Sequence, residues 1–307
     1  MLALFDDAST KTVLVTGADG FTGRYITEAL GSHGYRVVGM SLGNTASEAI
    51  IACDLTDSKS VFSMVEQVRP DYVIHLAALS FVGESDPEKF YQVNLFGTLN
   101  LLEALGRLDI SPKKVLIASS ANVYGTPGLD VLDESVCPNP VNHYANSKLA
   151  MEHMVRTWYD RLPIIITRPF NYTGPGQSER FLIPKIVGHF RRREREIKLG
   201  NLDVSRDFSD VRDVVKCYLA LLDSDTRSAV VNICSGEATP LREIIELMNS
   251  LAGYEIIVRV DPALIRANEI PSLRGSNLLL KKSIGFSPNV SLLDTLRTMS
   301  LHINSDT

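Results

Sequence analysis

Cysteine is scarce in this 307-residue sequence, and the few cysteines present are spread along the chain. They are Cys53, Cys137, Cys217 and Cys234, and no two of them form a CxxC pair. Structural zinc sites and dithiol redox motifs use closely spaced cysteines, so the sequence supports neither. We therefore expect free thiols in a reducing cytosol and no bound metal.

Long hydrophobic runs are also missing. No apolar stretch approaches the roughly 20 residues that a membrane-spanning helix needs. The segment from Met1 to Thr10 has Asp6 and Asp7 ahead of any basic residue, which is unlike a secretory signal peptide. We expect a cytoplasmic protein with no membrane partner.

Positive charge is not in excess. The formal net charge is -5 and the calculated pI is about 5.7, whereas nucleic-acid-binding proteins generally present a strongly positive face. The run from Arg191 to Glu196 mixes both signs, which is typical of a solvated helix face. We expect no nucleic-acid partner.

The overall composition is that of a globular protein. Hydrophobic residues make up 45% of the chain and charged residues 22%, so there is enough apolar surface to bury a full core. The length allows either one large domain or two that share a cleft, and both arrangements suit an enzyme.

Short runs rich in Val and Ile alternate with longer amphipathic segments in the first half of the chain. The predicted strands are Thr12–Thr16, Arg36–Met40, Tyr72–Leu76, Lys114–Ser119 and Ile164–Arg168. The predicted helices are Thr22–Ser32, Ser58–Val68 with Asp57 as its N-cap, Pro87–Leu105 and Tyr144–Tyr159. The strands are nearly continuous in apolar residues, which indicates burial on both faces, and parallel strands need helical crossovers. The sequence thus predicts an α/β fold with a doubly wound parallel sheet of the Rossmann type.

The alternation loosens after Arg168, where prolines and glycines cluster between positions 169 and 176. We therefore assign residues 1–168 mainly to the Rossmann domain. Residues 169–307 are assigned mainly to a smaller C-terminal α/β substrate-binding lobe, with the chain crossing between the two parts.

A glycine-rich loop joins the first predicted strand to the first predicted helix. Its residues are Gly17, Ala18, Asp19, Gly20, Phe21, Thr22 and Gly23, a GxxGxxG arrangement. Glycines let the backbone approach a pyrophosphate, and the helix N-terminus supplies amides and positive dipole to the phosphates. Three glycines can also be simple turn chemistry, but their position in a βαβ unit favours a dinucleotide-binding loop.

The end of the second strand bears on the choice of cofactor. An acidic residue usually stands there and holds the ribose 2'-hydroxyl of NAD, but this sequence has Ser41. NADP(H) is therefore favoured, and NAD(H) stays open because no arginine follows to bind a 2'-phosphate. Asp54 and Leu55 are candidates to bracket the adenine, although Asp54 is equally suited to capping a helix.

Tyr144 and Lys148 form a YxxxK pair whose spacing puts both side chains on the same side of a helix. The ammonium of Lys148 favours the ionised form of the tyrosine, which can then exchange a proton with a carbonyl group. The alternative is an amphipathic helix with an exposed lysine. Ser120, which follows a predicted strand, favours the catalytic interpretation because it offers a hydrogen-bond donor beside the tyrosine.

In these motifs the chain resembles the extended short-chain dehydrogenase/reductase superfamily over nearly its whole length. The matching segments are TGADGFTG, HLAA at His75 with Leu76, Ala77 and Ala78, VN at Asn94 followed by Gly97, SSANVYG, YANSK and RPFN. The resemblance implies a catalytic triad of Ser120, Tyr144 and Lys148. It also implies that Leu76, Ala77, Ala78 and Asn94 line or support the cofactor site, that Tyr144 and Lys148 contact the cofactor as well, with Lys148 holding the nicotinamide ribose, and that the second half binds a nucleoside diphosphate sugar.

Dehydratases of this superfamily carry an Asp-Glu pair directly after the catalytic hydroxyl residue. This sequence has Ala121 and Asn122 there, and neither side chain can shuttle a proton. Dehydration is therefore disfavoured, and ketone reduction or epimerisation at C4 remains.

The second half contains the segments PFNYTGPGQ from Pro169, GNLD from Gly200, RDF from Arg206 with DVRDV from Asp210, and NICSG from Asn232. These motifs resemble those of GDP-4-keto-6-deoxy-D-mannose reductases. By that resemblance Arg206 and Arg266 hold the diphosphate, Glu269 a ribose hydroxyl, and Asn171 the pyrophosphate or sugar. A planar guanidinium suits bidentate contact with phosphate oxygens. For Arg206 the alternative is a buried ion pair with Asp207 or Asp210.

The resemblance implies that the C4 ketone of a GDP-linked sugar is reduced at the expense of NADPH while Tyr144 protonates the developing alkoxide. The product is GDP-D-rhamnose or its C4 epimer. An NAD-dependent nucleotide-sugar 4-epimerase, which uses the same triad, and a non-catalytic nucleotide-binding regulator remain as alternatives. The helices Pro87–Leu105 and Tyr144–Tyr159 resemble those that form a four-helix bundle in homodimers of the superfamily.

Overall fold

The computed structural model describes residues 10–43, 49–80, 86–265 and 270–301. The chain divides into two compact units. The first takes in the described residues up to Ser119 together with His143–Thr167 and Tyr218–Val230. The second takes in Ser120–Asn142, Arg168–Cys217 and the described residues from Val231 onward.

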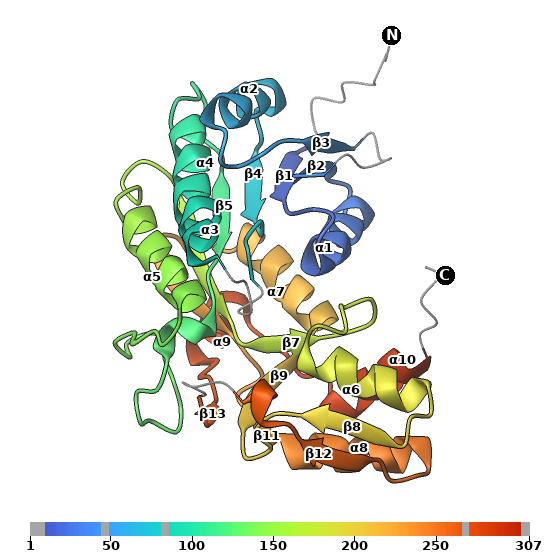
Figure 1. The fold of residues 1–307 in the computed structure, drawn as a ribbon. Helices are drawn as coiled ribbons and strands as arrows, with labels where there is room; N and C mark the ends of the chain where they lie inside the picture. Colours follow the sequence, from blue (N-terminus) through green and yellow to red (C-terminus); the bar gives the residue numbers. More distant parts are fainter. Residues whose placement is uncertain (1–9, 44–48, 81–85, 266–269, 302–307) are drawn as a thin grey trace. The chain divides into compact units, whose positions relative to one another are not determined.

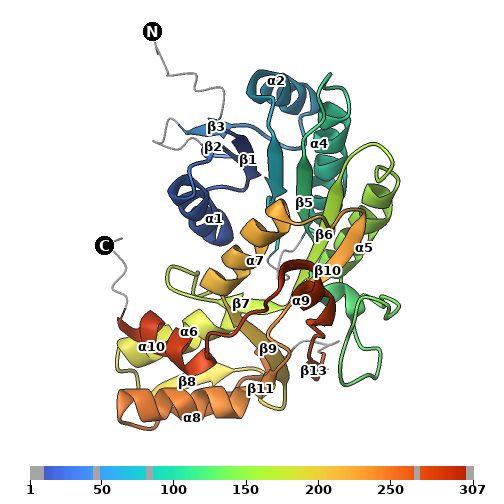
Figure 2. The ribbon, with the colours of Figure 1, turned by 180° about the vertical axis from the view of Figure 1, so that it is seen from behind.

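Within the described residues, the largest sheet has seven strands, in the order β10-β6-β5-β4-β1-β2-β3 (Figures 1 and 2). The strands are β1 (Thr12–Thr16), β2 (Arg36–Ser41), β3 (Ile50–Ala52), β4 (Tyr72–His75), β5 (Lys114–Ala118), β6 (Ile164–Pro169) and β10 (Ala229–Ile233). All pairs from β3 across to β6 are parallel. This is the Rossmann order, in which the crossovers change direction between β1 and β4.

Helices cover both faces of this sheet. They are α1 (Phe21–Ser32), α2 (Ser58–Val68), α3 (Pro87–Tyr91), α4 (Thr98–Leu105), α5 (His143–Arg156) and α7 (Val211–Asp223), the last shared between the two units. In both ribbon views α2, α4 and α5 lie on one face and α1 on the other. Leu14, Val115, Leu101 and Met151 belong to one buried core cluster, which joins the sheet to α4 and α5.

The segment predicted as one helix from Pro87 to Leu105 is interrupted. A π-helix, η1 (Gln92–Gly97), lies between α3 and α4. Inside it the side chain of Asn94 accepts a 2.8 Å hydrogen bond from the backbone N–H of Leu79 and donates a 3.1 Å bond to the carbonyl oxygen of Leu79. Single π-turns of this kind are frequent at functional sites. Apolar periodicity does not reveal them, because the residues on either side keep helical spacing.

The second unit contains two smaller sheets. The larger has β9 (Ser205–Asp210) between β11 (Ala238–Pro240) and β13 (Ser272–Leu273), with β7 (Asn171–Thr173) also paired to β9. The other pairs β8 (Glu196–Leu199) with β12 (Ile257–Val260). The remaining elements are η2 (Ala121–Tyr124), α6 (Leu182–Arg191), α8 (Leu241–Ala252), η3 (Pro262–Leu264), α9 (Leu278–Ile284) and α10 (Leu292–Leu301). Residues of α6, α8, α10 and β8 share one hydrophobic core.

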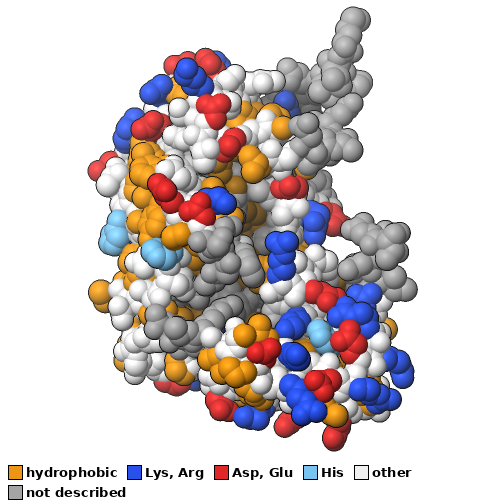
Figure 3. Space-filling view, viewed as in Figure 1, with side chains coloured by type: hydrophobic (Ala, Val, Ile, Leu, Met, Phe, Trp, Pro, Cys, Tyr) orange, Lys and Arg blue, Asp and Glu red, His pale blue; other side chains and the backbone are white. Residues whose placement is uncertain are grey.

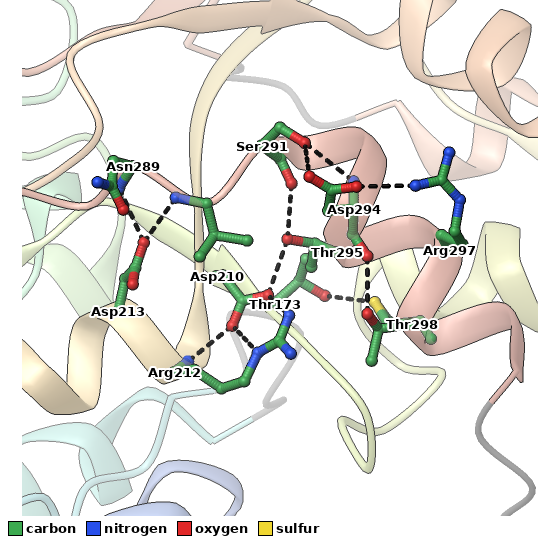
Figure 4. Close-up of polar contacts among 12 residues, drawn as sticks. Thr173, Asp210, Arg212, Asp213, Asn289, Ser291, Asp294, Thr295, Arg297 and Thr298 are labelled. Atoms are coloured by element: carbon green, nitrogen blue, oxygen red, sulfur yellow. Dashed lines mark hydrogen bonds and ion pairs between the residues drawn. The ribbon is translucent and has the colours of Figure 1, made fainter.

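Two buried carboxylates at the junction of β9 and α7 hold the C-terminal segment (Figure 4). Asp210 accepts hydrogen bonds from Arg212 and a 2.8 Å bond from the hydroxyl of Thr295 on α10. Asp213 accepts bonds from the backbone N–H groups of Asn289 and Val290 at 2.8 and 2.7 Å. The segment leading into α10 is thus attached to the β9–α7 turn by polar contacts as well as by apolar packing.

The predicted α/β fold with a Rossmann-type parallel sheet is confirmed, and all five predicted strands are present within one or two residues of the expected ends. Asp57 is the N-cap of α2, accepting a 3.0 Å bond from the N–H of Lys59. The short strand β3 was not predicted, because three residues carry too little pattern. Helix α5 ends at Arg156, three residues before the predicted end, where the chain passes into turns.

In the described part of the chain, no helix is long and apolar enough to cross a membrane. The described residues likewise contain no cluster of three or more His, Cys, Asp or Glu side chains placed to hold a metal ion. All four cysteines are described, and each is a free thiol.

Candidate active site

The glycine loop follows β1 and leads into α1 at the change of direction in the sheet. Gly17 has φ +69°, a conformation that favours glycine, and its N–H donates a 2.8 Å hydrogen bond to the carbonyl oxygen of Met40. A Cβ added to Gly17 would lie 2.9 Å from the backbone nitrogen of Ala77, and one added to Gly23 would collide with the carbonyl oxygen of Gly17. Backbone atoms of Leu76 and Ala77 therefore pack closely against Gly17, and backbone atoms of the loop itself pack closely against Gly23.

The same loop fits the pyrophosphate of a nicotinamide dinucleotide. Gly20 is the N-cap of α1 without any capping side chain, and both Gly20 and Asp19 are exposed. Phe21 and Thr22 begin the helix and are partly exposed. Helix N-termini offer N–H groups and positive potential to phosphate oxygens. Because Gly20 has no side chain, a phosphate can approach the backbone closely at this helix N-terminus.

The residues predicted to lie nearer the adenosine half occupy different environments. Ser41 is the last residue of β2 and is 4% exposed, with its hydroxyl accepting a 3.3 Å bond from the N–H of Gly43. Asp54 is exposed and accepts two 2.8 Å bonds from Thr56. Leu55 is buried in the core and packs against Gly97, where an added Cβ would lie 3.0 Å from the Cβ of Leu55. The capping of α2 falls to Asp57, which removes that alternative role from Asp54.

Leu76, Ala77 and Ala78 follow β4 and are all partly exposed. The N–H of Leu76 donates to the carbonyl oxygen of Thr16 at 3.2 Å, and that of Ala77 to the hydroxyl of the same threonine, also at 3.2 Å. The HLAA segment is thereby fixed against the end of β1, directly beside the glycine loop.

Buried His75 connects β1 to helix α4 through a chain of hydrogen bonds. The hydroxyl of Thr98 donates a 2.7 Å bond to the carbonyl oxygen of Asn94, which has no proton to offer in return. Thr98 must therefore accept the 2.8 Å bond from Nε2 of His75, and Nδ1 accepts from the hydroxyl of Thr16 at 2.7 Å. This network requires the neutral ring with its proton on Nε2.

Burial has a large electrostatic effect on this histidine. His75 is 1% exposed, and desolvation, with a smaller contribution from the charge of Lys148, lowers its pKa to about 3. The imidazole is therefore neutral at physiological pH, in agreement with the tautomer that the hydrogen bonds require. In the sequence, His75 was identified only as part of the HLAA motif, and its role in this hydrogen-bond network was not predicted.

The hydrogen-bond chain continues from the π-helix to the helix that carries Tyr144. The Nδ2 of Asn94 donates a 3.0 Å bond to the hydroxyl of Ser147, which itself donates to the carbonyl oxygen of Tyr144 at 2.8 Å. Asn94 and Ser147 are both fully buried. Asn94 therefore joins the segment after β4 to the first turn of α5.

Tyr144 and Lys148 lie one turn apart on α5, and both are largely buried, at 8% and 3% exposure. The Nζ of Lys148 donates a 2.8 Å bond to the carbonyl oxygen of Ala118 at the end of β5. Burial lowers the pKa of Lys148 to about 8, and the nearby charge of Glu152 opposes this effect. The ring of Tyr144 packs against that of Phe90, with centroids 6.1 Å apart.

Ser120 lies two residues after β5 and is the N-cap of η2, where its hydroxyl accepts a 3.2 Å bond from the N–H of Asn122. A hydroxyl that accepts a bond still carries its own proton for donation. Ser120 is 7% exposed and Ala121 is 1% exposed, so the residue that replaces the acid of a dehydratase faces the protein interior. By contact, Ser120 groups with the second unit, whereas Tyr144 and Lys148 belong to the first.

The turn that bears Ser120 is backed by a buried network that was not predicted. Tyr124 donates a 2.8 Å bond to Oδ1 of Asn232, whose N–H donates to Glu134 at 2.7 Å. The guanidinium of Arg168, 1% exposed, lies 4.7 Å from the centre of the Tyr124 ring. Burial raises the pKa of Tyr124 to about 12, so this phenol stays protonated and serves as a hydrogen-bond donor.

The predicted substrate residues of the second unit are only partly described. Asn171 begins β7 and Arg206 lies on β9, where its Nη1 donates to the carbonyl oxygen of Ser205 at 2.8 Å. Asp207 accepts bonds from Ser235, Gly236 and Gly275, and Asp210 is paired with Arg212. The two carboxylates considered as partners of Arg206 are thus held by other groups. Arg266 and Glu269 lie outside the described residues.

Sequence comparison relates the chain to enzymes that act on nucleotide sugars. A profile for the family described as "GDP-mannose 4,6 dehydratase" matches residues 14–299. A GDP-6-deoxy-D-talose 4-dehydrogenase from Aggregatibacter actinomycetemcomitans is 35% identical, with 89% of this chain and 91% of the relative covered. A GDP-6-deoxy-D-mannose reductase from Pseudomonas aeruginosa is also 35% identical, with 94% and 96% covered.

Solved structures of similar fold include proteins described as epimerases and proteins bound to a nicotinamide dinucleotide. A protein from Burkholderia cenocepacia described as a putative epimerase is 46% identical, with a TM-score of 0.89 over 94% of this chain and 97% of its own. RMD from Pseudomonas aeruginosa, complexed with NADPH, is 34% identical, with a TM-score of 0.82 over 95% and 96%. The UDP-glucose 4-epimerase of Thermus thermophilus, complexed with NAD, is 26% identical, with a TM-score of 0.86 over 96% and 100%.

Proposed function

The chain is an NAD(P)-dependent oxidoreductase that belongs to the GDP-mannose 4,6 dehydratase-like family of extended short-chain dehydrogenases/reductases, and from this premise we propose that it reduces the C4 ketone of a GDP-4-keto-6-deoxy-D-mannose type sugar. The names of both relatives at 35% identity support this proposal, because each describes a GDP-6-deoxy sugar and redox chemistry. The observation that carries it is the pair Tyr144 and Lys148 on one face of α5, with Lys148 held at the end of β5.

Dehydration, the activity in the family's name, is disfavoured by the residues after Ser120. The 4,6-elimination needs an acid and a base beside the sugar, but Ala121 and Asn122 carry neither. A family member without these groups retains the binding and redox machinery and loses the elimination step. A reductase or a C4 epimerase fits the residues that remain.

NADP(H) is the favoured cofactor, with NAD(H) as the alternative. Gly17, Asp19, Gly20, Phe21, Thr22 and Gly23 would hold the pyrophosphate, Ser41, Asp54 and Leu55 would lie toward the adenosine, and Leu76, Ala77, Ala78 and Asn94 would support the cofactor site. Ser41 supports NADP(H), because no carboxylate is present there to repel a 2'-phosphate. When bound, the reduced nicotinamide supplies the hydride that the ketone accepts.

The chain's own residues supply the proton and the stabilisation of charge. Tyr144 donates its phenolic proton to the ketone oxygen as negative charge develops there. The Lys148 ammonium lies one helical turn away and stabilises the resulting tyrosinate. Ser120 donates a hydrogen bond to the same substrate oxygen, and this bond strengthens as that oxygen gains charge.

Residues of the second unit bind the rest of the substrate in this proposal. Arg206 and Arg266 bind the diphosphate, Glu269 binds a ribose hydroxyl, and Asn171 contacts the pyrophosphate or sugar. The names of the two relatives, a deoxytalose dehydrogenase and a deoxymannose reductase, correspond to opposite configurations at C4. The product is accordingly GDP-D-rhamnose or its C4 epimer.

The proposal is tested by NADPH oxidation with 4-keto-6-deoxy sugars carried on GDP, UDP and dTDP. We expect turnover with the GDP sugar, and a loss of about 10²- to 10⁴-fold in kcat for Tyr144→Phe because the general acid is removed. Tyr254→Phe makes the same change at a residue outside the site and should leave kcat unchanged. Absence of turnover with the GDP sugar would contradict the substrate, and full turnover by Tyr144→Phe would contradict the assigned acid.

A C4 epimerase is the second candidate, because the 46% identical structure is described as a putative epimerase. An epimerase oxidises and re-reduces the same carbon, so it keeps its dinucleotide tightly bound. Purified protein that carries stoichiometric NAD and interconverts sugars without added cofactor would identify this activity. Net consumption of NADPH would identify the reductase.

A homodimer formed through a four-helix bundle is also part of the proposal. Hydrophobic side chains gather on the surface over α3, α4 and α5 (Figure 3). Phe96 is 48% exposed in η1, and Leu99 and Leu149 are partly exposed on the two helices. An apolar face on neighbouring helices suits packing against a second copy of itself.

A further inference from the structure

Helix α5 carries a carboxylate that no part of the proposed mechanism uses. Glu152 is completely buried, one turn after Lys148 and one turn before Arg156. Its Oε1 accepts a 2.6 Å hydrogen bond from the hydroxyl of Ser119, and its Oε2 lies 3.8 Å from Nη2 of Arg156. Lys148, Glu152 and Arg156 thus follow one another at one-turn intervals along one face of α5, with alternating charge, and we call these three residues the ladder.

The surroundings of Glu152 connect it to the end of β5. Ser119 directly follows Ala118, whose carbonyl oxygen accepts the bond from Lys148, and directly precedes Ser120. The N–H of Ser119 also donates to Thr167 on the neighbouring strand β6 at 2.7 Å. Lys148 and Glu152 therefore attach to consecutive residues of one fixed segment, the first at a backbone carbonyl and the second at a side-chain hydroxyl.

A buried carboxylate is costly to keep in a protein interior. Removal from water destabilises the charged form of a carboxylate, as it does that of a cation. A hydrophobic residue of similar size in place of such a buried charge would often leave the protein as stable or more stable. Glu152 has a close hydroxyl donor and a nearby cation, so its charge is partly compensated. The lysine in the same ladder is the residue that the reaction needs in its charged form.

We propose that Glu152 is a positioning residue for the reaction: its carboxylate, held by Ser119, keeps the Lys148 ammonium charged at the end of β5. This inference rests on the proposed function, in which Lys148 stabilises the tyrosinate of Tyr144. Glu152 contacts neither substrate nor cofactor in this scheme, and it acts through Lys148.

The electrostatics around Lys148 set the sign of the expected effect. Burial lowers the pKa of Lys148, and the Glu152 charge raises it. The charge of Lys148 interacts with that of Glu152, one turn further along α5, and with neutral His75 on β4, and Tyr144 lies one turn before Lys148 on the same helix. Removing the Glu152 charge leaves desolvation unopposed, so the pKa of Lys148 falls and its charged fraction at neutral pH decreases.

The direct test is a pH titration of Lys148 by NMR in protein labelled at lysine Cε. The Lys148 signal is assigned by its absence from Lys148→Arg, so the measurement requires neither substrate nor turnover. In Glu152→Gln we expect the pKa of Lys148 to fall by about one unit relative to the wild type, a shift typical of losing one nearby opposite charge. The same neutralisation at exposed Glu103, in Glu103→Gln, should leave it unchanged.

Ser119→Ala provides a second variant should Glu152→Gln fail to fold. The carboxylate then keeps its charge but loses the hydroxyl that holds it, and it turns toward Arg156 and away from Lys148. We expect a smaller fall in the pKa of Lys148. An unchanged pKa in folded Glu152→Gln, or in Ser119→Ala where the first variant is unfolded, overturns the proposal, because a purely structural ladder would not control the lysine.

Activity gives a separate readout. If the protein reduces the GDP sugar, the alkaline limb of the kcat profile in Glu152→Gln should move to lower pH by the same amount as the titration, with little change in KM. If no substrate is turned over, the proposed function fails while the NMR titration still decides the role of Glu152. The two proposals can therefore fail independently.

Discussion

At the scale of single residues, the burial of polar groups gives the first unit its definite geometry. His75 accepts from Thr16 and donates to Thr98, and each of these hydroxyls is used in both directions. A histidine in such a chain cannot be protonated without losing the bond from Thr16. The hydrogen bonds that join β1, the HLAA segment and α4 therefore depend on a neutral ring.

This dependence predicts a loss of stability in mild acid. The unfolded histidine has a pKa near 6.5, whereas the folded one titrates at about 3, so the unfolded state binds more protons as the pH falls between these values. The His75 contribution to the free energy of unfolding is complete above pH 6.5 and decreases by about 1.4 kcal/mol per pH unit below it.

His75→Gln isolates the effect, because glutamine keeps a donor and an acceptor but does not titrate. Urea denaturation should find the variant less stable at pH 7.5, with the gap to the wild type smaller by about 2 kcal/mol at pH 5. A gap that is the same at both pH values would show that His75 is protonated equally in the folded and unfolded states.

At the scale of elements, the β1–α1 unit shows how closely backbone can approach backbone. Gly17 and Gly23 stand where added Cβ atoms would meet main-chain atoms, which cannot move away as a flexible side chain can. Gly31, in the same helix, has nothing within 4 Å of an added Cβ. Helix α1 thus contains one glycine, Gly23, that close packing against the loop requires, and a second, Gly31, that could be replaced by a larger residue.

We expect Gly23→Ala to abolish cofactor binding, because the helix must shift away from the loop and its first amides leave their positions. Gly31→Ala should bind normally and be more stable by about 0.5–1 kcal/mol, since alanine favours the helix. Fluorescence titration with NADPH and thermal unfolding would measure the two effects. Normal NADPH affinity in Gly23→Ala would contradict the assigned phosphate site.

At the scale of the whole molecule, the exposed apolar surface around Phe96 bears on whether the protein forms a dimer. Phe96 is exposed on a π-helix whose inner side carries Asn94, so one short element faces both the protein interior and the proposed dimer partner. Attachment of a second copy would also restrict α5, the helix that bears Tyr144 and Lys148.

Phe96→Glu should convert a dimer into a monomer, because it places a charge in an apolar contact. Analytical ultracentrifugation would detect the change as a halving of the mass. Leu278→Glu introduces the same charge at a leucine that is 74% exposed in the second unit, and it should leave the mass unchanged. A Phe96→Glu protein that keeps the mass of the wild type would contradict the bundle interface.

The sequence by itself determined the features that depend on near neighbours. Five of the seven strands of the central sheet, the cap at Asp57, the glycine loop and the one-turn spacing of Tyr144 and Lys148 all follow from patterns within a few residues, whereas β3 and β10 were not predicted. Only the tertiary structure decided which distant groups meet: Thr16 with His75 and Thr98, Ser119 with Glu152, and Tyr124 with Arg168 and Asn232. These partners are far apart in the sequence, and the parallel register and the crossovers bring them together. Local propensity cannot specify such pairs, because their energies arise only once the chain is folded and water is excluded.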